Sequence, residues 1–188
     1  MELQSVHKFL IKPVEGKQYI NTVKAGDKEV IVNTSIENAE DVQRFAEVLA
    51  LPMCYDGNVQ VGDTVVVQHN VFRIAVNDWG VPKQSNNHIN DNCFWIDEEL
   101  IYLIIRKGVK IATDNYVFVE PIKIETKWEG IKLENHVGLL RFPNKKLKNQ
   151  GLKDGDKVVF HKDSEYEFKI DNKIMYMMRN IRLLAKIK

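Results

Sequence analysis

The sequence predicts an all-β fold built from two small domains in tandem, and three observations support this expectation. A Gly-Asp turn that opens an apolar, β-branched run occurs twice, as VGDTVVV at residues 61–67 and as DGDKVVF at residues 154–160. Short runs rich in Phe, Val and Ile, bounded by Gly, Asp, Asn and Pro, occur along the chain and are typical of β-strands. The 188 residues are enough for two domains that each bury a core. Several short strands in each half predict a small β-barrel or sandwich.

The strand motifs of the first half recur in the second half in the same order, as an internal repeat does. The matching stretches are FLIKP at 9–13 with VFVEP at 117–121, EVLALP at 47–52 with GLLRFP at 138–143, and FWIDEELIYL at 94–103 with FKIDNKIMYM at 168–177. In the last pair, the Asp that follows Ile is expected to bond the backbone of a tight turn, and so to link two strands as a hairpin in each half. The polar stretch Thr113-Asp114-Asn115 then separates domain 1–113 from domain 114–188.

The first half is longer than the second in two places. The stretch from Pro13 to Pro52 exceeds the stretch from Pro121 to Pro143, and the stretch between the Gly-Asp turn and the Phe-x-Ile-Asp motif is also longer. The first domain is therefore expected to carry insertions at about residues 14–46 and 70–93, and the second domain is the minimal version.

Charge and composition exclude several classes of protein. The formal net charge is +1 with 28% charged residues, so no overall field favours nucleic acid or an acidic membrane. The N-terminal residues lack the apolar core of a signal peptide, and no apolar run approaches the ~20 residues of a membrane span. Two cysteines, Cys54 and Cys93, do not make a disulfide framework. We expect a soluble, cytoplasmic protein that binds neither nucleic acid nor membrane.

No sequence motif indicates catalysis, a cofactor or a metal. A P-loop, a Gly-rich dinucleotide turn and a GxSxG motif are all missing from the sequence, which argues against an enzyme. The spacing of His69, His88 and Cys93 fits no tight metal site, so these residues are interpreted as polar loop residues. The basic run at 145–148 has no aromatic platform beside it and is interpreted as a solvated loop.

The order of these motifs resembles that of the GroES-type co-chaperonins, the chaperonin-10 family. The resemblance is carried by EVLAL, VGDTVVV and IDEELIYLI in the first half, and by FKIDNKIMYMMRNIRLLAKIK at residues 168–188 in the second. It implies two tandem GroES-like β-barrels and a co-chaperonin that caps a GroEL-type chaperonin cage during ATP-dependent protein folding. It also implies a homo-oligomeric ring in which first and last strands of neighbouring subunits pair, here residues 9–12 and 183–188. The sequence lacks an obvious roof hairpin, as some phage-encoded members do.

The resemblance also implies a binding site. The family's mobile loop lies between the first strand and the EVLA strand, and Val30-Ile31-Val32 stands in the place of the apolar tripeptide that docks on the chaperonin. A flexible segment loses conformational entropy when it becomes ordered on binding, so a single loop binds weakly. A ring that presents several such loops binds more tightly, because the loops act together. Two departures are Glu29 in place of the usual glycine and the 70–93 insertion, which has no family counterpart.

Three alternatives stay open at this point. Val30-Ile31-Val32 could be an ordinary strand instead of a mobile loop. Residues 37–51 have apolar side chains at helical spacing, whereas the repeat places residues 47–51 in a strand, so we expect at most a short helix before that strand. The chain could also be a structural or assembly protein, of viral origin for instance, that uses GroES-like barrels as building blocks without binding a chaperonin.

Overall fold

The protein is mostly β-structure and forms two antiparallel sheets of seven and six strands. The computed structural model describes residues 5–20, 22–25, 28–31, 41–90, 92–126, 130–162 and 164–187. Contacts between Cα atoms divide the chain into two compact units, Met1–Gly108 (unit 1) and Val109–Lys188 (unit 2). The division falls in a hairpin turn a few residues before the expected junction at Thr113. The prediction of an all-β fold is confirmed.

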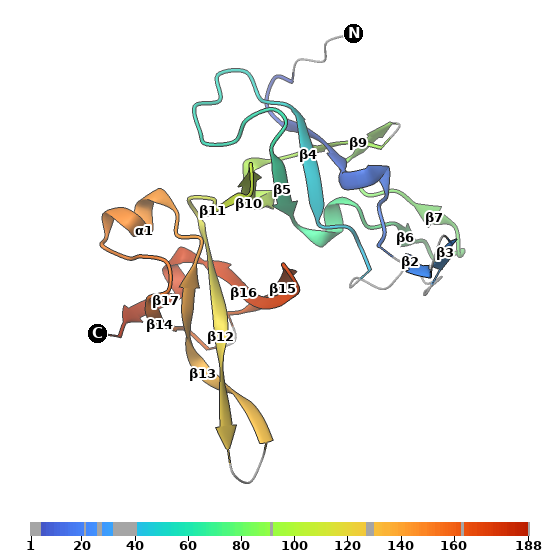
Figure 1. Cartoon of the computed structure of the whole chain (residues 1–188). Helices are drawn as coiled ribbons and strands as arrows, with labels where there is room; N and C mark the ends of the chain where they lie inside the picture. The colour runs from blue at the N-terminus through green and yellow to red at the C-terminus, as the bar shows by residue number, and fades with distance from the viewer. Residues whose placement is uncertain are drawn as a thin grey trace. The chain divides into compact units, whose positions relative to one another are not determined.

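The seven-stranded sheet contains the motif-bearing strands of the first half (Figure 1). Its strands are β1 (Phe9–Pro13), β4 (Phe45–Ala50), β5 (Thr64–Val67), β8 (His88–Asn90), β9 (Cys93–Ile96), β10 (Ile101–Arg106) and β11 (Val109–Ala112), in the order β11-β10-β5-β4-β1-β9-β8. Two short hairpins lie outside it, β2 (Thr22–Ala25) with β3 (Lys28–Ile31) and β6 (Ala75–Val76) with β7 (Pro82–Lys83). Single 3-10 turns η1 (Val14–Gly16), η2 (His69–Val71) and η3 (Glu98–Leu100) connect strands. Residues 45–50 thus form a strand, as the repeat predicted.

The six-stranded sheet belongs to unit 2. Its strands are β12 (Tyr116–Thr126), β13 (Gly130–Arg141), β14 (Lys157–Phe160), β15 (Tyr166–Ile170), β16 (Lys173–Arg179) and β17 (Leu183–Lys186), in the order β15-β16-β12-β13-β14-β17. In Figure 1, β12 and β13 project as a long hairpin beyond the other strands of this unit. The described residues contain one α-helix, α1 (Lys145–Asn149), and a 3-10 turn, η4 (Asn180–Arg182). None of the helices in the described part of the chain is long and apolar enough to span a membrane.

The two sheets follow the same path through five strands. The order β10-β5-β4-β1-β9 in the first sheet corresponds to β17-β14-β13-β12-β16 in the second, and β8 and β15 add a hairpin partner to β9 and β16. In both units the end strands of this order are consecutive in the chain and are linked by a 3-10 turn. Hydrogen bonds among the described strands leave these end strands unpaired with each other, so neither sheet is a closed barrel.

This strand order corrects one part of the sequence repeat. Residues 168–177 do form a hairpin, whose turn residues Asp171 and Asn172 have φ of 50° and 60°. In residues 94–103, however, β9 pairs with β1 and β10 pairs with β5, so the predicted hairpin at Ile-Asp-Glu-Glu is wrong. Asp97 instead leads into η3. The hairpin of unit 1 lies earlier, between β8 and β9, where Asn92 has φ of 63°.

The Gly-Asp turns that revealed the repeat have the same geometry in both units. Gly62 and Gly155 have φ of 85° and 83°, which a residue with a side chain adopts only with strain. Each Asp carboxylate accepts a hydrogen bond from the backbone N–H three residues earlier, at 2.7 Å in both cases. The Asp carbonyl of each turn accepts a hydrogen bond from the neighbouring strand, from Val48 at 3.0 Å or Leu140 at 2.8 Å. The doubled motif is therefore a doubled structural unit.

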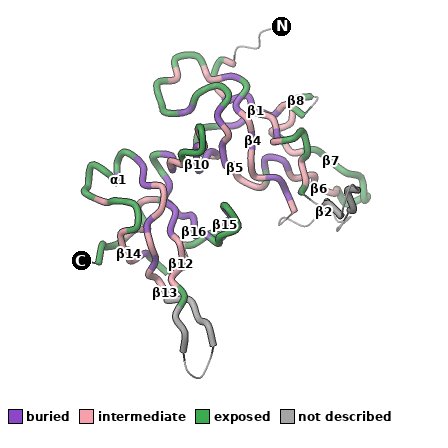
Figure 2. The backbone as a smooth tube through the Cα atoms, viewed as in Figure 1, coloured by how far each residue is buried: buried purple, intermediate pink, exposed green. Residues whose placement is uncertain are grey.

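Each unit has its own hydrophobic core, and the buried residues follow the central strands (Figure 2). The core of unit 1 includes Phe9, Ile11, Phe94 and Ile96, together with Val71 and Phe72 from the 70–93 insertion. The insertion therefore contributes to the core of the domain and is not only a surface loop.

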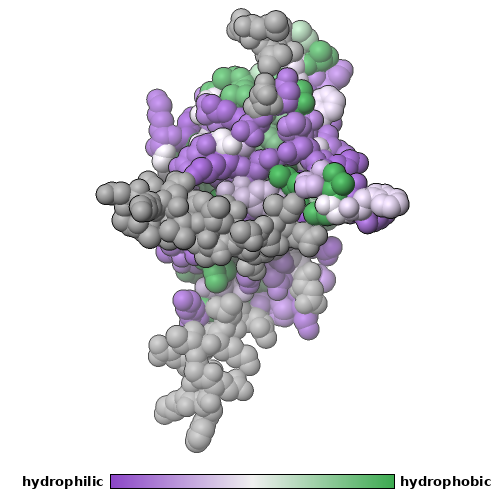
Figure 3. All heavy atoms as spheres, turned by 90° about the vertical axis from the view of Figure 1, so that its right-hand side faces the viewer, coloured by the Kyte–Doolittle hydropathy of each residue, from purple (hydrophilic) through white to green (hydrophobic). Residues whose placement is uncertain are grey.

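One predicted sheet edge is wrong and the other is correct. Residues 9–12 were expected to be an edge, but β1 pairs with β4 on one side and with β9 on the other. Strand β17 is an edge, because its hydrogen-bonded neighbour in the sheet is β14 alone. Ile181 and Leu184 at this edge are 82% and 60% exposed. On the face shown in Figure 3, the exposed hydrophobic side chains lie in small separate groups.

A glycine in β13 permits close packing of β12 against it. A Cβ atom at Gly138 would lie 2.3 Å from Cγ1 of Val119 and 2.8 Å from the backbone oxygen of Glu120. Val119 is fully buried, and a backbone oxygen in a sheet cannot move away at little cost. We expect Gly138→Ala to destabilise unit 2 by about 1–3 kcal/mol, the usual cost of overpacking, measured by urea denaturation. A variant as stable as the parent would show that β12 and β13 separate easily.

Candidate functional site

The predicted docking residues lie in the connection between β1 and β4 of unit 1. In this connection β2 and β3 form a two-stranded antiparallel ladder in which Val23 is opposite Val30 and Thr22 is opposite Ile31. The backbone of Val30 and Ile31 is therefore in a strand, as one of the two sequence alternatives proposed. Val32 lies outside the described residues. We refer to residues 21–40, which include this hairpin, as the arm.

The two ends of the arm are held together at its base. Tyr19 and Val42 form an antiparallel bridge. The N–H of Ile20 donates to the carbonyl of Asp41 at 2.7 Å, and the N–H of Gln43 donates to the carbonyl of Gln18 at 2.8 Å. Val42 is 1% exposed and belongs to the core. We call residues 16–20 and 41–43 the neck. The neck fixes where the chain leaves and re-enters the core of unit 1.

The 70–93 insertion holds the neck in place. Nε2 of Gln18 donates to the carbonyl of Phe72 at 3.2 Å and to Oε1 of Gln84 at 2.9 Å. The hydroxyl of Tyr19 accepts a hydrogen bond from the N–H of Ile74 at 2.8 Å. Further along, Nδ2 of Asn92 donates to the carbonyl of Gly16 at 2.8 Å. The 70–93 insertion thus supports the base of the arm through these hydrogen bonds, which could not be predicted from the sequence.

The chemistry of the neighbouring titratable groups does not point to catalysis. Burial, followed by the charges of Arg44 and Arg73, lowers the pKa of His69, so this imidazole is neutral at pH 7. Burial raises the pKa of the Cys93 thiol, which is the opposite of what a nucleophilic thiolate needs. Among the described residues no three His, Cys, Asp or Glu side chains are grouped as metal ligands would be.

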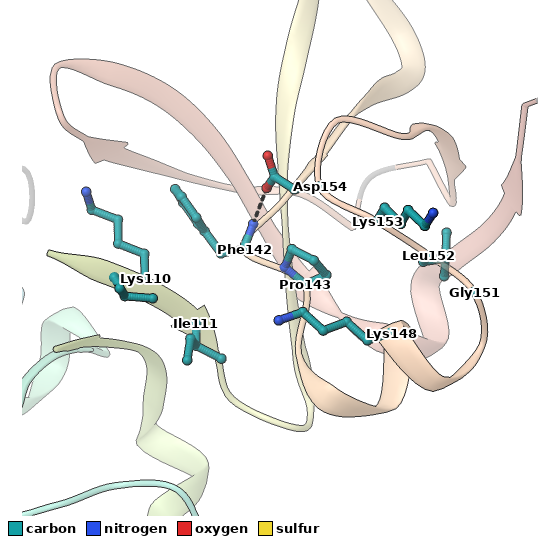
Figure 4. A pocket seen from close by; sticks show the side chains of 10 residues that line it. Lys110, Ile111, Phe142, Pro143, Lys148, Gly151, Leu152, Lys153 and Asp154 are labelled. Carbon is teal, nitrogen blue, oxygen red and sulfur yellow. Dashed lines mark hydrogen bonds between the residues drawn. The ribbon is translucent and has the colours of Figure 1, made fainter.

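Unit 2 has a pocket of about 540 Å³ in which two of the charged side chains, Lys110 and Asp154, are already paired (Figure 4). The carboxylate of Asp154 accepts hydrogen bonds from the N–H of Phe142 at 2.9 Å and from Arg141 at 3.1 Å. The ammonium of Lys110 is in an ion pair with Asp171. The pocket is completed by apolar side chains and by the exposed lysines Lys148 and Lys153.

Comparisons with known proteins do not assign a family. No protein-family model matches the chain, and no curated protein matches its sequence. The resemblance of its motifs to the GroES type therefore remains a hypothesis that rests on the residues themselves.

Proposed function

We propose that this chain is a co-chaperonin of the GroES type, which caps a GroEL-type chaperonin cage and assists ATP-dependent protein folding. The observation that carries the proposal is the arm, which leaves unit 1 between β1 and β4, the place of the family's docking loop. Two features support it: the same five-strand path occurs in both sheets, and the same Gly-Asp turn occurs in both units. We propose that each five-strand path is the wall of a GroES-like barrel.

The arm suits a reversible contact. A short apolar strand can enter a groove of a partner and add main-chain hydrogen bonds to side-chain burial. Burying three aliphatic side chains yields only a few kcal/mol at roughly 25 cal/mol per Å², before the entropy lost on ordering is subtracted. A contact of this strength can be broken in each cycle. A braced neck lowers the entropic cost, because the ends of the arm are already in position.

We propose a homo-oligomeric ring, since several arms that act together recover the affinity that one arm lacks. Of the two strands predicted to pair between subunits, β1 lies inside its own sheet. Of the two, only β17 is an edge strand that a neighbouring subunit could pair with. An edge strand with exposed Ile181 and Leu184 beside it would be covered by a neighbouring subunit.

Replacing Ile31 with Ser tests the proposal. We expect nucleotide-dependent binding to a GroEL-type chaperonin, measured by size-exclusion chromatography with and without ATP, to weaken strongly, because the loss multiplies over every arm in a ring. The thermal stability of unit 1 should stay unchanged, since β3 belongs to neither large sheet. Lys24→Ser, on the opposite strand of the same hairpin, is the matched control and should bind as the parent does.

The result also separates the co-chaperonin from the structural-protein alternative. A parent protein that does not bind chaperonin with ATP contradicts the proposal. A large fall in melting temperature for Ile31→Ser, without a specific loss of binding, would instead identify Val30-Ile31-Val32 as a structural strand. Protection of the arm from proteases in the absence of chaperonin would favour an assembly protein.

A further inference from the structure

A second concave site lies in the 70–93 insertion of unit 1, and it is strongly biased toward positive charge. The pocket has a volume of about 460 Å³ and is lined by ten residues between Asn70 and Asn87. Arg73 and Lys83 line it, whereas no Asp or Glu does. The other polar lining comes from amide and hydroxyl side chains such as Asn70, Ser85 and Asn87. The charged groups of the lining are therefore cations, and its amide and hydroxyl groups can donate or accept hydrogen bonds.

One buried donor in this pocket has no acceptor. Nε of Arg73 is buried and makes no hydrogen bond. Neither Arg73 nor Lys83 is in an ion pair with another described residue. A buried polar group without a partner costs free energy, and most such groups in folded proteins bind an ion, water or ligand. By contrast, Arg106 and Arg141, the last residues of β10 and β13, are both paired with carboxylates.

The wall that faces Arg73 is fixed before any ligand binds. The hydroxyl of Ser85 donates to the carbonyl of Val71 at 2.6 Å and accepts from the N–H of Asn87 at 3.3 Å. Nδ2 of Asn87 donates to the carbonyl of Trp95 at 2.9 Å, and Nε1 of Trp95 donates to the carbonyl of Asn86 at 3.0 Å. Residues 85–87 are thereby tied to β9 of the large sheet, so the pocket is preorganised.

We propose that this pocket binds an oxyanion, a carboxylate or phosphate group, through the guanidinium of Arg73 with Lys83 at the rim. The planar fork of a guanidinium matches the two oxygens of either group, and the guanidinium of Arg73 has no carboxylate partner among the described residues. The lowered pKa of His69 agrees with an excess of positive charge here, since Arg44 and Arg73 contribute to it after burial. The inference does not depend on the proposed co-chaperonin function.

The position of the pocket suggests what the oxyanion does. Ile74 and Gln84 line the pocket and also hydrogen-bond to Tyr19 and Gln18 of the neck. An oxyanion that holds Arg73 therefore stabilises the same residues that brace the base of the arm. The oxyanion comes either from an acidic side chain of a partner protein or from a free phosphate compound. Arg73 and Lys83 would bind both in the same way, through paired negatively charged oxygens.

The experiment is an NMR titration of the full-length protein with inorganic phosphate and, separately, with N-acetyl-aspartate, at constant ionic strength set with chloride. We expect saturable shifts confined to the amides of residues 70–76 and 83–87, with a dissociation constant on the order of 1 mM, since a small oxyanion gains only one or two charged hydrogen bonds. Saturation by phosphate alone points to a free phosphate compound. Saturation by the carboxylate points to an acidic partner.

Variants separate this site from general attraction to positive charge. Arg73→Gln should weaken binding by at least about 10-fold, and Arg73→Lys should also weaken it because the planar fork of the guanidinium is lost. Lys83→Gln, at an exposed rim position, should weaken binding by about 2- to 5-fold and keeps the test valid if Arg73→Gln does not fold. Arg182→Gln, an exposed arginine of unit 2, is the control and should change nothing. Shifts scattered over all lysines, or binding that survives both Arg73 variants, would overturn the proposal.

Discussion

Replacing Phe72 with Ala should destabilise unit 1 by about 3–5 kcal/mol, the usual cost of removing a buried aromatic ring. Phe72 is fully buried, and its ring packs edge-on against that of Phe94, with centroids 4.8 Å apart and an interplanar angle of 83°. Aromatic pairs of this geometry add stability beyond the area that they bury. Since a domain of this size is stable by only about 5–15 kcal/mol, the loss is a large fraction of the total.

The measurement is chemical denaturation followed by a probe of each unit, so that unit 2 provides an internal reference. Ile89→Ala is the matched control, because Ile89 lies in the same insertion but is 43% exposed, and it should cost less than about 1 kcal/mol. If the two variants were equally stable, the insertion would be a surface attachment and Phe72 would not be part of the core.

Much of the fold could be predicted from the sequence because its signals are local. The Gly-Asp turns need a glycine at positive φ followed by an Asp that bonds the backbone three residues earlier, and both requirements can be read from residues 61–67 and 154–160. The β-branched runs that follow are buried strands in both units. The repeat therefore identified equivalent strands before any pairing was known.

The pairing itself could not be predicted from these local signals. Residues 94–103 and 168–177 have Phe, Ile, Asp and Tyr at matching positions, yet the first stretch crosses a 3-10 turn and the second forms a hairpin. A better signal is Asn92, which follows an Asp in the sequence as Asn172 does and has a positive φ that Asn tolerates. The internal position of β1 depends on β9, which is more than 80 residues away in the chain.

The candidate site was predicted only in part for the same reason. The long stretch between the motifs at 9–13 and 47–52 predicted where the arm lies. The position of Val30-Ile31-Val32 within that stretch predicted the apolar tripeptide. The neck and the oxyanion pocket depend on contacts between residues 16–20 and the 70–93 insertion, for example from Asn92 to Gly16. Such contacts leave no pattern in the sequence, since each involves a single polar side chain in a loop.

Replacing Arg106 with Ala should destabilise unit 1 by about 2–4 kcal/mol, because it leaves the carboxylate of Asp63 buried without its partner. Arg106 contacts both oxygens of Asp63, from Nε at 2.7 Å and from a terminal nitrogen at 2.6 Å. The side chain of Asp63 is 3% exposed, while that of Arg106 is 36% exposed, so the expected cost is below that of a fully buried pair. Lys186→Ala, which removes the cation beside the equivalent Asp156 in unit 2, is the control and should have little effect because that pair is more exposed.

The pH dependence gives this prediction a second readout. Burial alone would raise the pKa of Asp63, but the hydrogen bonds from Arg106 and from the N–H of Gln60, together with the charge of Arg106, lower it below 3.8. A carboxyl group whose pKa is lower in the folded than in the unfolded protein stabilises the fold above the unfolded pKa, and this contribution is lost as the pH falls through the folded pKa. Without Arg106, burial is opposed by Gln60 alone and the pKa of Asp63 rises. The difference in the free energy of unfolding between parent and Arg106→Ala should therefore be largest near pH 7 and shrink toward about pH 3. A difference that is the same at both pH values would mean that Arg106 stabilises unit 1 by packing and not through the charge of Asp63.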